Sequence, residues 1–412
     1  MPKCRACQAP LKKNWIDLGQ TPVVNVPLLS QTSQSLLQPL KVMVCEQCWL
    51  VQTTVTSSSV SAHFWGNERQ GTKLLSSPSS YITNFVRKTM LRAGLDADSL
   101  VIDLKLNNSE LLKSFKNKFT KVLGITSEEH IAAELRANDI NVEVSDWGKL
   151  VAEKLSRDGV SADLIVANNV LPFVDDIHDF VAGCAHILAE NGWIVFNFPH
   201  LVALMEHGQF DAITHDQRFY FSLTSLMPLF LHHGLVLADV ETLPVRGGEL
   251  RVWLRHVSAS RLDDMCAMRV AGVLSQEWSM PLDDAAGYNG FQERIEQRIA
   301  EVRDFLIKAK AEGKRTVAYG ATAKGNMLLN VAQLNHDLID YVVDAVPSRQ
   351  ACWLPGCGLE VKPLECLKDD KPDYLLILPW HRRYEIWEEF SEAFRDWGGQ
   401  AVVAIPSLEL LS

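Results

Sequence analysis

The chain has 412 residues, of which 47% are hydrophobic and 22% are charged, and its formal net charge at pH 7 is -10. These values are typical of a globular protein with two or three domains. The acidic balance argues against broad electrostatic binding to nucleic acid or to an anionic membrane. No apolar run reaches the roughly 18–20 residues of a membrane span, and the N-terminus has no signal-peptide core, so we expect a cytoplasmic protein.

The N-terminal region carries two CxxC pairs, CRAC at 4–7 and CEQC at 45–48. Two thiolates separated by two residues chelate one ion, and a second pair completes a tetrahedron. Such a zinc ion has no open position for a reactive water, so its role would be structural. Reduced or redox-active thiols are the alternative. We expect a zinc-binding module at residues 1–65, with the metal ligands Cys4, Cys7, Cys45 and Cys48.

The middle of the chain alternates short β-branched runs with helical patterns. The runs read VIDL, KVLGIT, NVEVS, DLIVANN and WIVFNFP, and segments such as SEEHIAAELRAND lie between them. This alternation indicates βαβ units and a mostly parallel sheet. The last two runs, LVLADVETLP and GELRVWLRH, flank Gly247 and Gly248 and predict a β-hairpin. We therefore expect a Rossmann-like domain at residues 66–258.

A long helical stretch, roughly 260–312, leads into a second α/β unit. Its strands are predicted at TVAYGAT, IDYVVD, YLLILPW and AVVAIP, with a helix starting near Lys324. The expected fold class is therefore α/β, with an N-terminal zinc-binding module and two Rossmann-like domains. The second of these domains, with its helical linker, is assigned to residues 259–412.

The order of these parts and several motifs resemble one family. The similarity is carried by WIDLGQTPVVN, ADLIVANNVL, GATAKGNMLLN, YVVDAVP and KPDYLLILPW, and it spans nearly the whole chain. The chain resembles the three-domain S-adenosylmethionine-dependent C-methyltransferases of deoxysugar biosynthesis, which methylate nucleotide-linked keto-sugars. The resemblance implies that the middle domain is a methyltransferase domain and that the ligand is a nucleotide-sugar-like small molecule.

The cofactor-binding turn departs from the family pattern. Family members have an E-I-G-S-N-D-G-like turn, whose glycines let the backbone approach the cofactor. Here Asp103 takes the acidic place and Asn107 remains, but Lys105 and Ser109 stand at the glycine places. At the end of the next strand, Thr126 replaces the acid that binds the ribose. The cofactor-binding residues Asp103, Asn107 and Thr126 thus form a degenerate site, and we expect S-adenosylmethionine binding to be weakened or lost.

The acid–base motif is also altered. The family motif resembles F-D-x-I-Y-H-E-H, whereas residues 210–217 read FDAITHDQ, with Thr214 at the tyrosine place and Gln217 at the place of the second histidine. Methyl transfer needs a base that removes the proton next to the keto group, and neither threonine nor glutamine does so near neutral pH. The remaining candidate catalytic groups are His215, Asp216, Tyr220 and Arg246.

The C-terminal motifs match the family more closely. Gly320 and Gly325 bracket a strand-to-helix turn whose free N–H groups suit a phosphate. Asp344 stands where a ribose-binding acid often lies, or caps a turn. Trp380 stacks on a base or sugar, or packs in the core. We expect the substrate-binding residues to be Lys324, Asn326, Asp344 and Trp380.

Three functional hypotheses follow from the resemblance. The first is a divergent homologue that binds a nucleotide-sugar-like ligand, with methyl transfer impaired, lost or replaced by other chemistry. The second is an active C-methyltransferase acting on a nucleotide-linked keto-deoxysugar, for which His200 or His215 supplies a base. The third is a non-catalytic partner of another protein, built on a retired methyltransferase scaffold.

Overall fold

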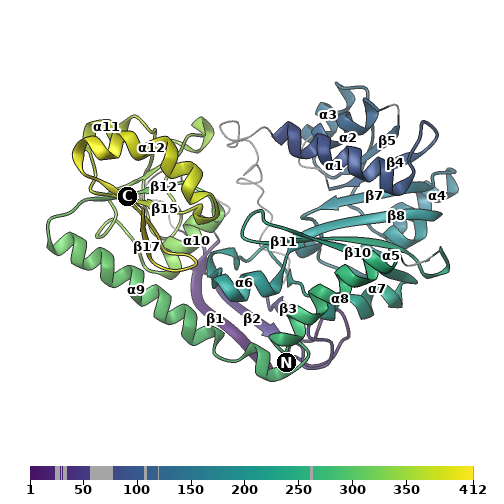
Figure 1. The fold of residues 1–412 in the computed structure, drawn as a ribbon, viewed down its shortest axis with the longest axis horizontal. Helices are drawn as coiled ribbons and strands as arrows, with labels where there is room; N and C mark the ends of the chain where they lie inside the picture. The colour runs from purple at the N-terminus through teal and green to yellow at the C-terminus, as the bar shows by residue number, and fades with distance from the viewer. Residues whose placement is uncertain are drawn as a thin grey trace.

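The computed structural model describes residues 1–23, 28, 30, 35–55, 78–105, 109–118, 120–259 and 263–411. These residues form three β-sheets with flanking helices, which confirms the α/β fold class (Figure 1). In this view the C-terminal sheet lies on the left, the middle sheet lies on the right, and the N-terminal strands lie low between them. Within the described ranges, no helix combines the length and the apolar character that crossing a membrane requires.

The N-terminal sheet is antiparallel and has the order β1-β2-β3-β9. Its fourth strand comes from far along the chain, directly after the FDAITHDQ motif, and this pairing was not anticipated from the sequence. The acid–base motif is therefore anchored to the zinc-binding module. The strands are β1 (Lys13–Pro22), β2 (Leu37–Val44), β3 (Val51–Thr53) and β9 (Phe219–Tyr220).

The middle sheet has seven strands in the order β10-β11-β8-β7-β4-β5-β6. Strand β11 is antiparallel to both its neighbours, and the other pairs are parallel. The predicted parallel sheet and its terminal hairpin are thus confirmed. The strands are β4 (Leu100–Leu104), β5 (Lys121–Thr126), β6 (Asn141–Val144), β7 (Ala162–Asn168), β8 (Leu188–Pro199), β10 (Leu235–Leu243) and β11 (Glu249–His256).

Helices cover both faces of this sheet. In β4, Val101 packs with the cluster under α1, α2 and α3, whereas its neighbour Ile102 packs with the cluster under α4, α5 and α7. Successive side chains point to opposite faces, so a strand buried on both faces reads as a continuous apolar run. The helices are α1 (Pro78–Ala93), α2 (Glu110–Lys116), α3 (Glu129–Arg136), α4 (Lys149–Arg157), α5 (Ile177–Ile187), α6 (Leu201–His207) and α7 (Leu223–His232).

The chain reverses its direction of travel across the middle sheet at β4. From β4 it moves outward through β5 and β6, and then returns to β7 on the other side of β4. In open α/β sheets, ligands bind outside the carboxyl ends of the strands at this switch point. The turn after β4 and the loop after Asn168 therefore lie at the position where a cofactor binds in this class of fold.

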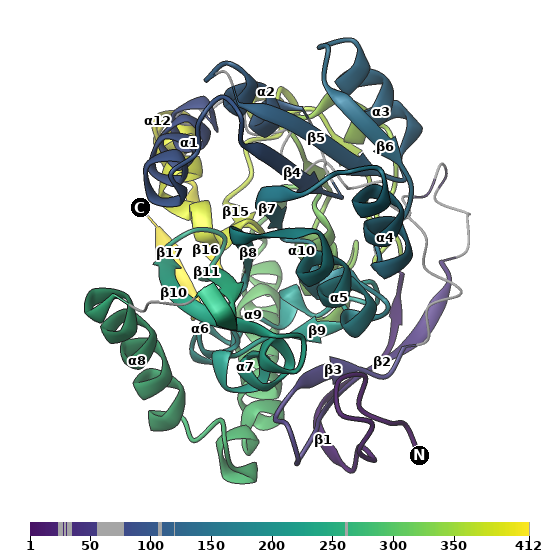
Figure 2. The ribbon, with the colours of Figure 1, turned by 90° about the vertical axis from the view of Figure 1, so that its right-hand side faces the viewer.

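The predicted helical stretch at 260–312 is divided into two helices, α8 (Asp264–Ser279) and α9 (Phe291–Ala311). Pro281 and Gly290 lie in the interruption, and Gly290 has a positive φ of 72°. Helix α8 packs on the middle sheet, because the Arg269 guanidinium donates two hydrogen bonds of 2.8 and 2.7 Å to the buried Asp239 carboxylate of β10. In Figure 2, α8 lies at the lower left and the N-terminal strands lie at the lower right.

The C-terminal sheet has the order β14-β13-β12-β15-β16-β17, and all its pairs are parallel except β16 with β17. The expected second Rossmann-like unit is confirmed. Its elements are β12 (Thr316–Tyr319), α10 (Ala323–Val331), β13 (Val342–Val343), β14 (Val361–Lys362), α11 (Cys366–Asp370), β15 (Tyr374–Ile377), α12 (Arg383–Trp397), β16 (Gln400–Val403) and β17 (Glu409–Leu411).

One buried cluster joins the N-terminal sheet, α6, α9 and the C-terminal sheet. Trp15 of β1 stacks on Phe291 at the start of α9, with ring centroids 4.4 Å apart and planes 13° apart. The ring of Tyr220 lies 6.2 Å from the same indole. The N-terminal module is therefore packed into the molecule and holds the two Rossmann-like units together.

Candidate functional site

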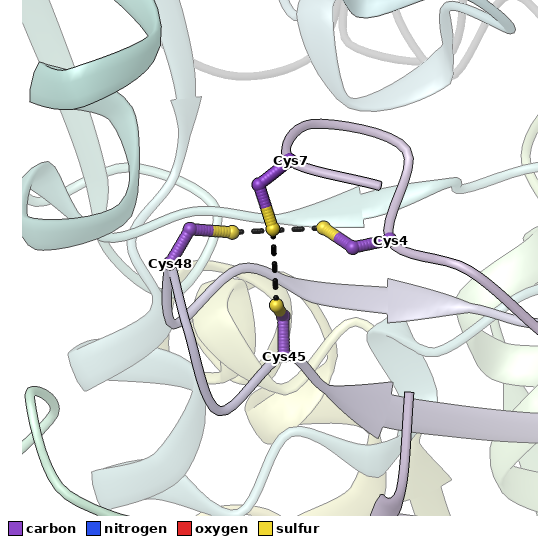
Figure 3. Close-up of side chains that lie close together, drawn as sticks. All are labelled: Cys4, Cys7, Cys45 and Cys48. Atoms are coloured by element: carbon purple, nitrogen blue, oxygen red, sulfur yellow. Dashed lines mark hydrogen bonds between the residues drawn. The ribbon is translucent and has the colours of Figure 1, made fainter. Parts of the chain in front are cut away.

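The four N-terminal cysteines come together, as Figure 3 shows. The Cys4 and Cys48 sulfur atoms lie 3.5 Å apart, and the Cys7 and Cys45 sulfur atoms lie 3.4 Å apart. All four sulfur atoms lie within 4.8 Å of one another. A zinc ion with bonds of about 2.3 Å would hold tetrahedral sulfur atoms roughly 3.8 Å apart, so the side chains need only a small adjustment.

The surroundings of these cysteines suit a thiolate metal site. The Gln52 side-chain amide and the Ala6 backbone amide donate hydrogen bonds of 3.1 and 3.4 Å to the Cys4 sulfur. The hydrogen bond from Cys48 is the main cause that lowers the pKa of Cys4, to about 5, whereas the same contact raises the pKa of Cys48 and burial raises that of Cys7 to about 11. Four sulfur ligands complete a tetrahedron, so zinc bound here would be structural and would leave no open position for a reactant.

In the turn after β4, a lysine adopts the backbone conformation that glycine usually adopts. Lys105 has a φ of +49°, in the left-handed region that costs a residue with a side chain roughly 1–2 kcal/mol. Its backbone amide donates a 2.8 Å hydrogen bond to the Ile125 carbonyl. Asp103, at the end of β4, is 6% exposed. Asn107, the third residue expected in this turn, lies outside the described residues.

Ser109 and Thr126 both have local partners. The buried Ser109 hydroxyl donates to the Glu134 carboxylate of α3, and its backbone amide lies 3.3 Å from the same oxygen. The buried Thr126 hydroxyl accepts the Glu128 amide at 3.1 Å, which caps the turn after β5. Neither residue provides the two-oxygen acceptor or the open backbone that the family pattern places there.

A polar network that the sequence analysis missed lies at the same edge of the sheet. The buried Glu249 carboxylate accepts a 2.9 Å hydrogen bond from Arg246 and contacts the Asn169 side-chain amide at 3.3 and 3.4 Å. Asn169 has a positive φ of 55° and follows β7 directly. Glu249 at the start of the apolar run GELRVWLRH was the sequence signal for this network. A carboxylate in a buried strand is rarely unpaired, so it indicates a nearby hydrogen-bond donor or cation.

The candidate acid–base residues lie against the N-terminal module. The His215 Nε2 contacts the Gln38 carbonyl at 3.2 Å, so this nitrogen carries the proton, and burial lowers the pKa of the ring. Asp216 accepts a 2.6 Å hydrogen bond from the Thr214 hydroxyl. Tyr220 is buried in β9, and burial raises the pKa of its hydroxyl. Arg246 lies in the β10–β11 turn, where its guanidinium donates a 2.9 Å hydrogen bond to Glu249.

His200 contacts a buried carboxylate that caps a helix. Its Nε2 lies 2.9 Å from the Glu277 carboxylate of α8. The same buried carboxylate accepts the backbone amides of Leu223 and Thr224 at 2.7 and 2.8 Å, which caps the start of α7. This shared contact explains the burial of His200 by packing and capping rather than by contact with a reactant.

A second polar cluster forms between the middle and C-terminal units. The buried Asp211 accepts a 3.0 Å hydrogen bond from the Trp380 indole N–H, and the His207 ring lies edge-on to that indole at 5.9 Å. Burial raises the pKa of Asp211, although the nearby Lys324 cation opposes the shift. We define the interdomain cluster by its five residues, Asp211, Arg246, Lys324, Trp380 and His381.

Positive charge gathers in the interdomain cluster. The pKa of His381 is lowered to about 3, mainly by burial and further by three cations, Lys324, Arg382 and Arg246. The Lys324 side chain makes no hydrogen bond or ion pair in the part of the chain that the structure describes. Lys324 and Trp380 were expected to bind substrate, and Arg246 was expected to act in catalysis. Asp211 and His381 were not expected site residues, although FDAITHDQ and PWHRRYEI both show an ionisable group beside an aromatic residue.

The other expected substrate residues are largely engaged within the C-terminal unit. The Asp344 carboxylate accepts the Ala321 and Val346 amides, each at 2.8 Å, as a turn cap would. It also lies 3.4 Å from the guanidinium of Arg349, which is buried. The Asn326 Oδ1 accepts from Asn330 at 2.8 Å, whereas its Nδ2 has no hydrogen-bond partner among the described residues.

Solved structures of methyltransferases resemble part of the chain. An S-adenosylmethionine-dependent methyltransferase from Clostridium acetobutylicum aligns with 47% of this chain and 96% of its own, at a TM-score of 0.37 and 10% identity. The 1,6-didemethyltoxoflavin-N1-methyltransferase of Burkholderia thailandensis aligns with 50% of this chain and 95% of its own, at a TM-score of 0.36 and 12% identity.

Family models and one full-length relative cover the chain more completely. "Putative zinc binding domain" matches residues 4–60, "Methyltransferase domain" matches 104–196 and "C-methyltransferase C-terminal domain" matches 244–406. C-methyltransferase NovU of Streptomyces niveus is 30% identical over 417 residues, which cover 100% of this chain and 97% of NovU. The chain therefore belongs to the three-domain C-methyltransferase family, with a zinc-binding module, a methyltransferase domain and a C-terminal domain.

Proposed function

We propose that this family member binds a nucleotide-linked sugar at the interdomain cluster, and that methyl transfer from S-adenosylmethionine is impaired, lost or replaced by other chemistry. The main support is a buried carboxylate oxygen of Asp211 that accepts no hydrogen bond from the described residues. Asp211 Oδ1 has no hydrogen-bond partner among the described residues, while Oδ2 of the same carboxylate binds Trp380. An unpaired buried oxygen costs about 1–3 kcal/mol, which a bound hydroxyl group would recover.

The charges of the cluster favour a phosphorylated ligand. Lys324 lies at the start of α10, where the Thr322 hydroxyl accepts the Gly325 amide and leaves the first amides of the helix available to a ligand. A helix N-terminus and a neighbouring ammonium group both attract phosphate. Arg246 brings a second cation from the middle unit. A diphosphate between the two units would therefore meet positive charge from both.

The turn geometry supports the loss of methyl transfer. Lys105 adds a long side chain at a left-handed position where family members have glycine. Glu134 binds Ser109, and the Glu128 amide binds Thr126, so these hydroxyl groups already take part in local contacts. The described residues at the carboxyl ends of β4 and β5 thus fit S-adenosylmethionine poorly, and we derive no reaction step through it.

An active C-methyltransferase is the second candidate, and the full-length match to NovU favours it. The seven-stranded topology is complete, and Asp103 still stands at the end of β4. His215 retains one chemical property of a base, because its lowered pKa keeps the ring neutral near pH 7. Micromolar binding of S-adenosylmethionine, with methyl incorporation into a nucleotide-linked keto-sugar, would establish this candidate over the first.

Calorimetric titration of the full chain tests the proposal. The probes are S-adenosylmethionine and three nucleoside diphosphates, dTDP, UDP and GDP. We expect one diphosphate to bind, Lys324→Ala and Arg246→Ala each to weaken it by about tenfold or more, and S-adenosylmethionine to give no measurable heat. Lys308→Ala is the matched control, because Lys308 is exposed on α9 away from the cluster.

Two results would contradict the proposal. Diphosphate binding that is unchanged in both cluster variants would place the ligand elsewhere. Failure of every small-molecule probe, together with a tightly bound protein in a pull-down, would favour the third hypothesis, a non-catalytic partner.

A further inference from the structure

Three histidines form a cluster that the four-cysteine site and the interdomain cluster do not include. His178 is in the first turn of α5, His232 ends α7, and His233 follows it. His178 Nδ1 lies 2.9 Å from His233 Nε2, and one nitrogen from each of the three rings lies within 4.8 Å of the other two. We propose that these three imidazoles bind a divalent transition-metal ion, at a site separate from the cysteines.

The hydrogen bonds of His178 fix which of its ring nitrogens is free to bind a metal ion. Its Nε2 lies 2.6 Å from the Ala6 carbonyl oxygen, which can only accept, so Nε2 carries the proton. The lone pair of a neutral ring is then on Nδ1, the atom that faces His233. Metal-binding histidines commonly donate their other N–H to a backbone carbonyl, which fixes the tautomer and the orientation of the ring.

The geometry needs only small side-chain movements. Zinc–nitrogen bonds of about 2.0–2.1 Å hold tetrahedral nitrogen atoms roughly 3.3 Å apart, a few tenths of an ångström more than the His178–His233 distance. His232 is exposed at the end of α7 and can rotate toward the other two rings, whose centroids lie 5.5 and 5.0 Å from its own. Three protein nitrogens would leave the fourth position open to solvent.

The ligand set selects the class of ion. Imidazole nitrogens suit zinc, nickel and copper, whereas magnesium and calcium take oxygen ligands. Within the part of the chain that the structure describes, the three histidines and the four cysteines are the two residue groups with metal-binding geometry. The chemistry of the two groups differs, so an imidazole-preferring ion such as Ni²⁺ distinguishes them.

The three histidines lie where a bound ion would link two helices of the middle domain. Helices α5 and α7 cover the same face of the middle sheet (Figures 1 and 2). The Ala6 carbonyl that His178 binds lies between Cys4 and Cys7, in the first zinc knuckle. An ion shared by His178 and His233 would therefore join α5 to α7 and support the docking of the knuckle on the middle domain. Such binding raises the melting temperature, by an amount that grows with the logarithm of the free ion concentration once that concentration exceeds the dissociation constant.

The test titrates NiCl₂ into the zinc-loaded full chain by calorimetry, and metal analysis follows the zinc content. We expect one Ni²⁺ per chain beyond the zinc and a higher melting temperature with Ni²⁺. His232→Ala should weaken Ni²⁺ by at least about tenfold, because loss of a ligand costs no less than loss of an outer-shell partner. His336→Ala is the matched control, since His336 is a 70% exposed histidine in the C-terminal unit.

Each other outcome overturns the proposal. If the unaltered chain takes up no Ni²⁺, the three histidines form a hydrogen-bonded group only. If His232→Ala and His336→Ala bind Ni²⁺ equally well, the ion binds elsewhere. His232 is exposed, so its removal should not prevent folding, and an unchanged zinc content confirms that the knuckles remain intact. His233→Gln provides a second variant with the same expected loss of Ni²⁺.

Discussion

The Trp380 indole donates a 3.0 Å hydrogen bond to the Asp211 carboxylate across the boundary between the C-terminal and middle units. Both residues are almost fully buried, and they are separated by most of the C-terminal half of the chain. This contact links a residue of the altered acid–base motif to a residue of the well-matched C-terminal motif. It makes the interdomain cluster the best-defined candidate for ligand binding.

Trp380→Phe should destabilise the protein by about 1–3 kcal/mol, because it leaves the buried Asp211 without its donor. Urea unfolding monitored by circular dichroism measures the change. Trp278→Phe is the control, since Trp278 is 55% exposed and we expect an effect within about 0.5 kcal/mol. Equal effects of the two substitutions would show that the interdomain hydrogen bond contributes nothing measurable.

Asp211→Asn should change how stability depends on pH. Burial raises the pKa of Asp211, so the folded chain holds this proton more tightly than the unfolded chain does. The stabilisation is complete below the unfolded pKa of about 3.9 and is lost as the pH rises through the folded value. Asparagine keeps an acceptor for Trp380 and carries no charge. We therefore expect the unaltered chain to lose stability relative to Asp211→Asn as the pH rises from about 4 to neutrality.

Urea unfolding at a series of pH values measures this difference. Asp283→Asn, at an exposed position, should leave the profile parallel to that of the unaltered chain. A parallel profile for Asp211→Asn would contradict the expected titration of the buried carboxylate.

Chelation should remove the zinc and lower the melting temperature of the full chain, since structural zinc binding is coupled to folding. Cys48→Ser should lose the ion without chelator and then show no further change when chelator is added. Cys366→Ser is the control, because Cys366 lies in α11 away from the four-cysteine site. Metal analysis and thermal melting report both effects, and full zinc content in Cys48→Ser would exclude Cys48 as a ligand.

The combined change Lys105→Gly, Ser109→Gly and Thr126→Asp should increase affinity for S-adenosylmethionine by about tenfold or more. Glycine suits the +49° φ at residue 105 and removes a side chain from the turn. An aspartate at residue 126 keeps the contact with the Glu128 amide and adds a second oxygen for the ribose. Calorimetry measures the affinity.

The matched control for this experiment replaces Thr126→Asp by Thr126→Asn in the same double-glycine background. Asparagine has a similar shape without the charge, so we expect a smaller gain. No gain in the aspartate variant would show that these three positions do not cause the expected loss of binding.

Features that depend on neighbouring residues were predicted well. The CxxC spacing predicted the four-cysteine site, and apolar runs predicted the seven strands of the middle sheet and four strands of the C-terminal sheet. The short strands β14 and β17 of the C-terminal sheet were not predicted. The break between α8 and α9 was not predicted, although Pro281 and Gly290 are a local signal for it. The helical patterns on both sides of these two residues had predicted one continuous helical stretch.

The sequence by itself determined the fold class and the cysteine site, because periodicity and CxxC spacing are properties of residues close together along the chain. It also determined the family, through the resemblance of its motifs to those of known C-methyltransferases. Only the tertiary structure decided which distant polar groups meet. Asp211 with Trp380, and His178 with His233, are brought together by the packing of separate elements. Such proximity depends on the burial of whole helices and sheets, and no local pattern records it.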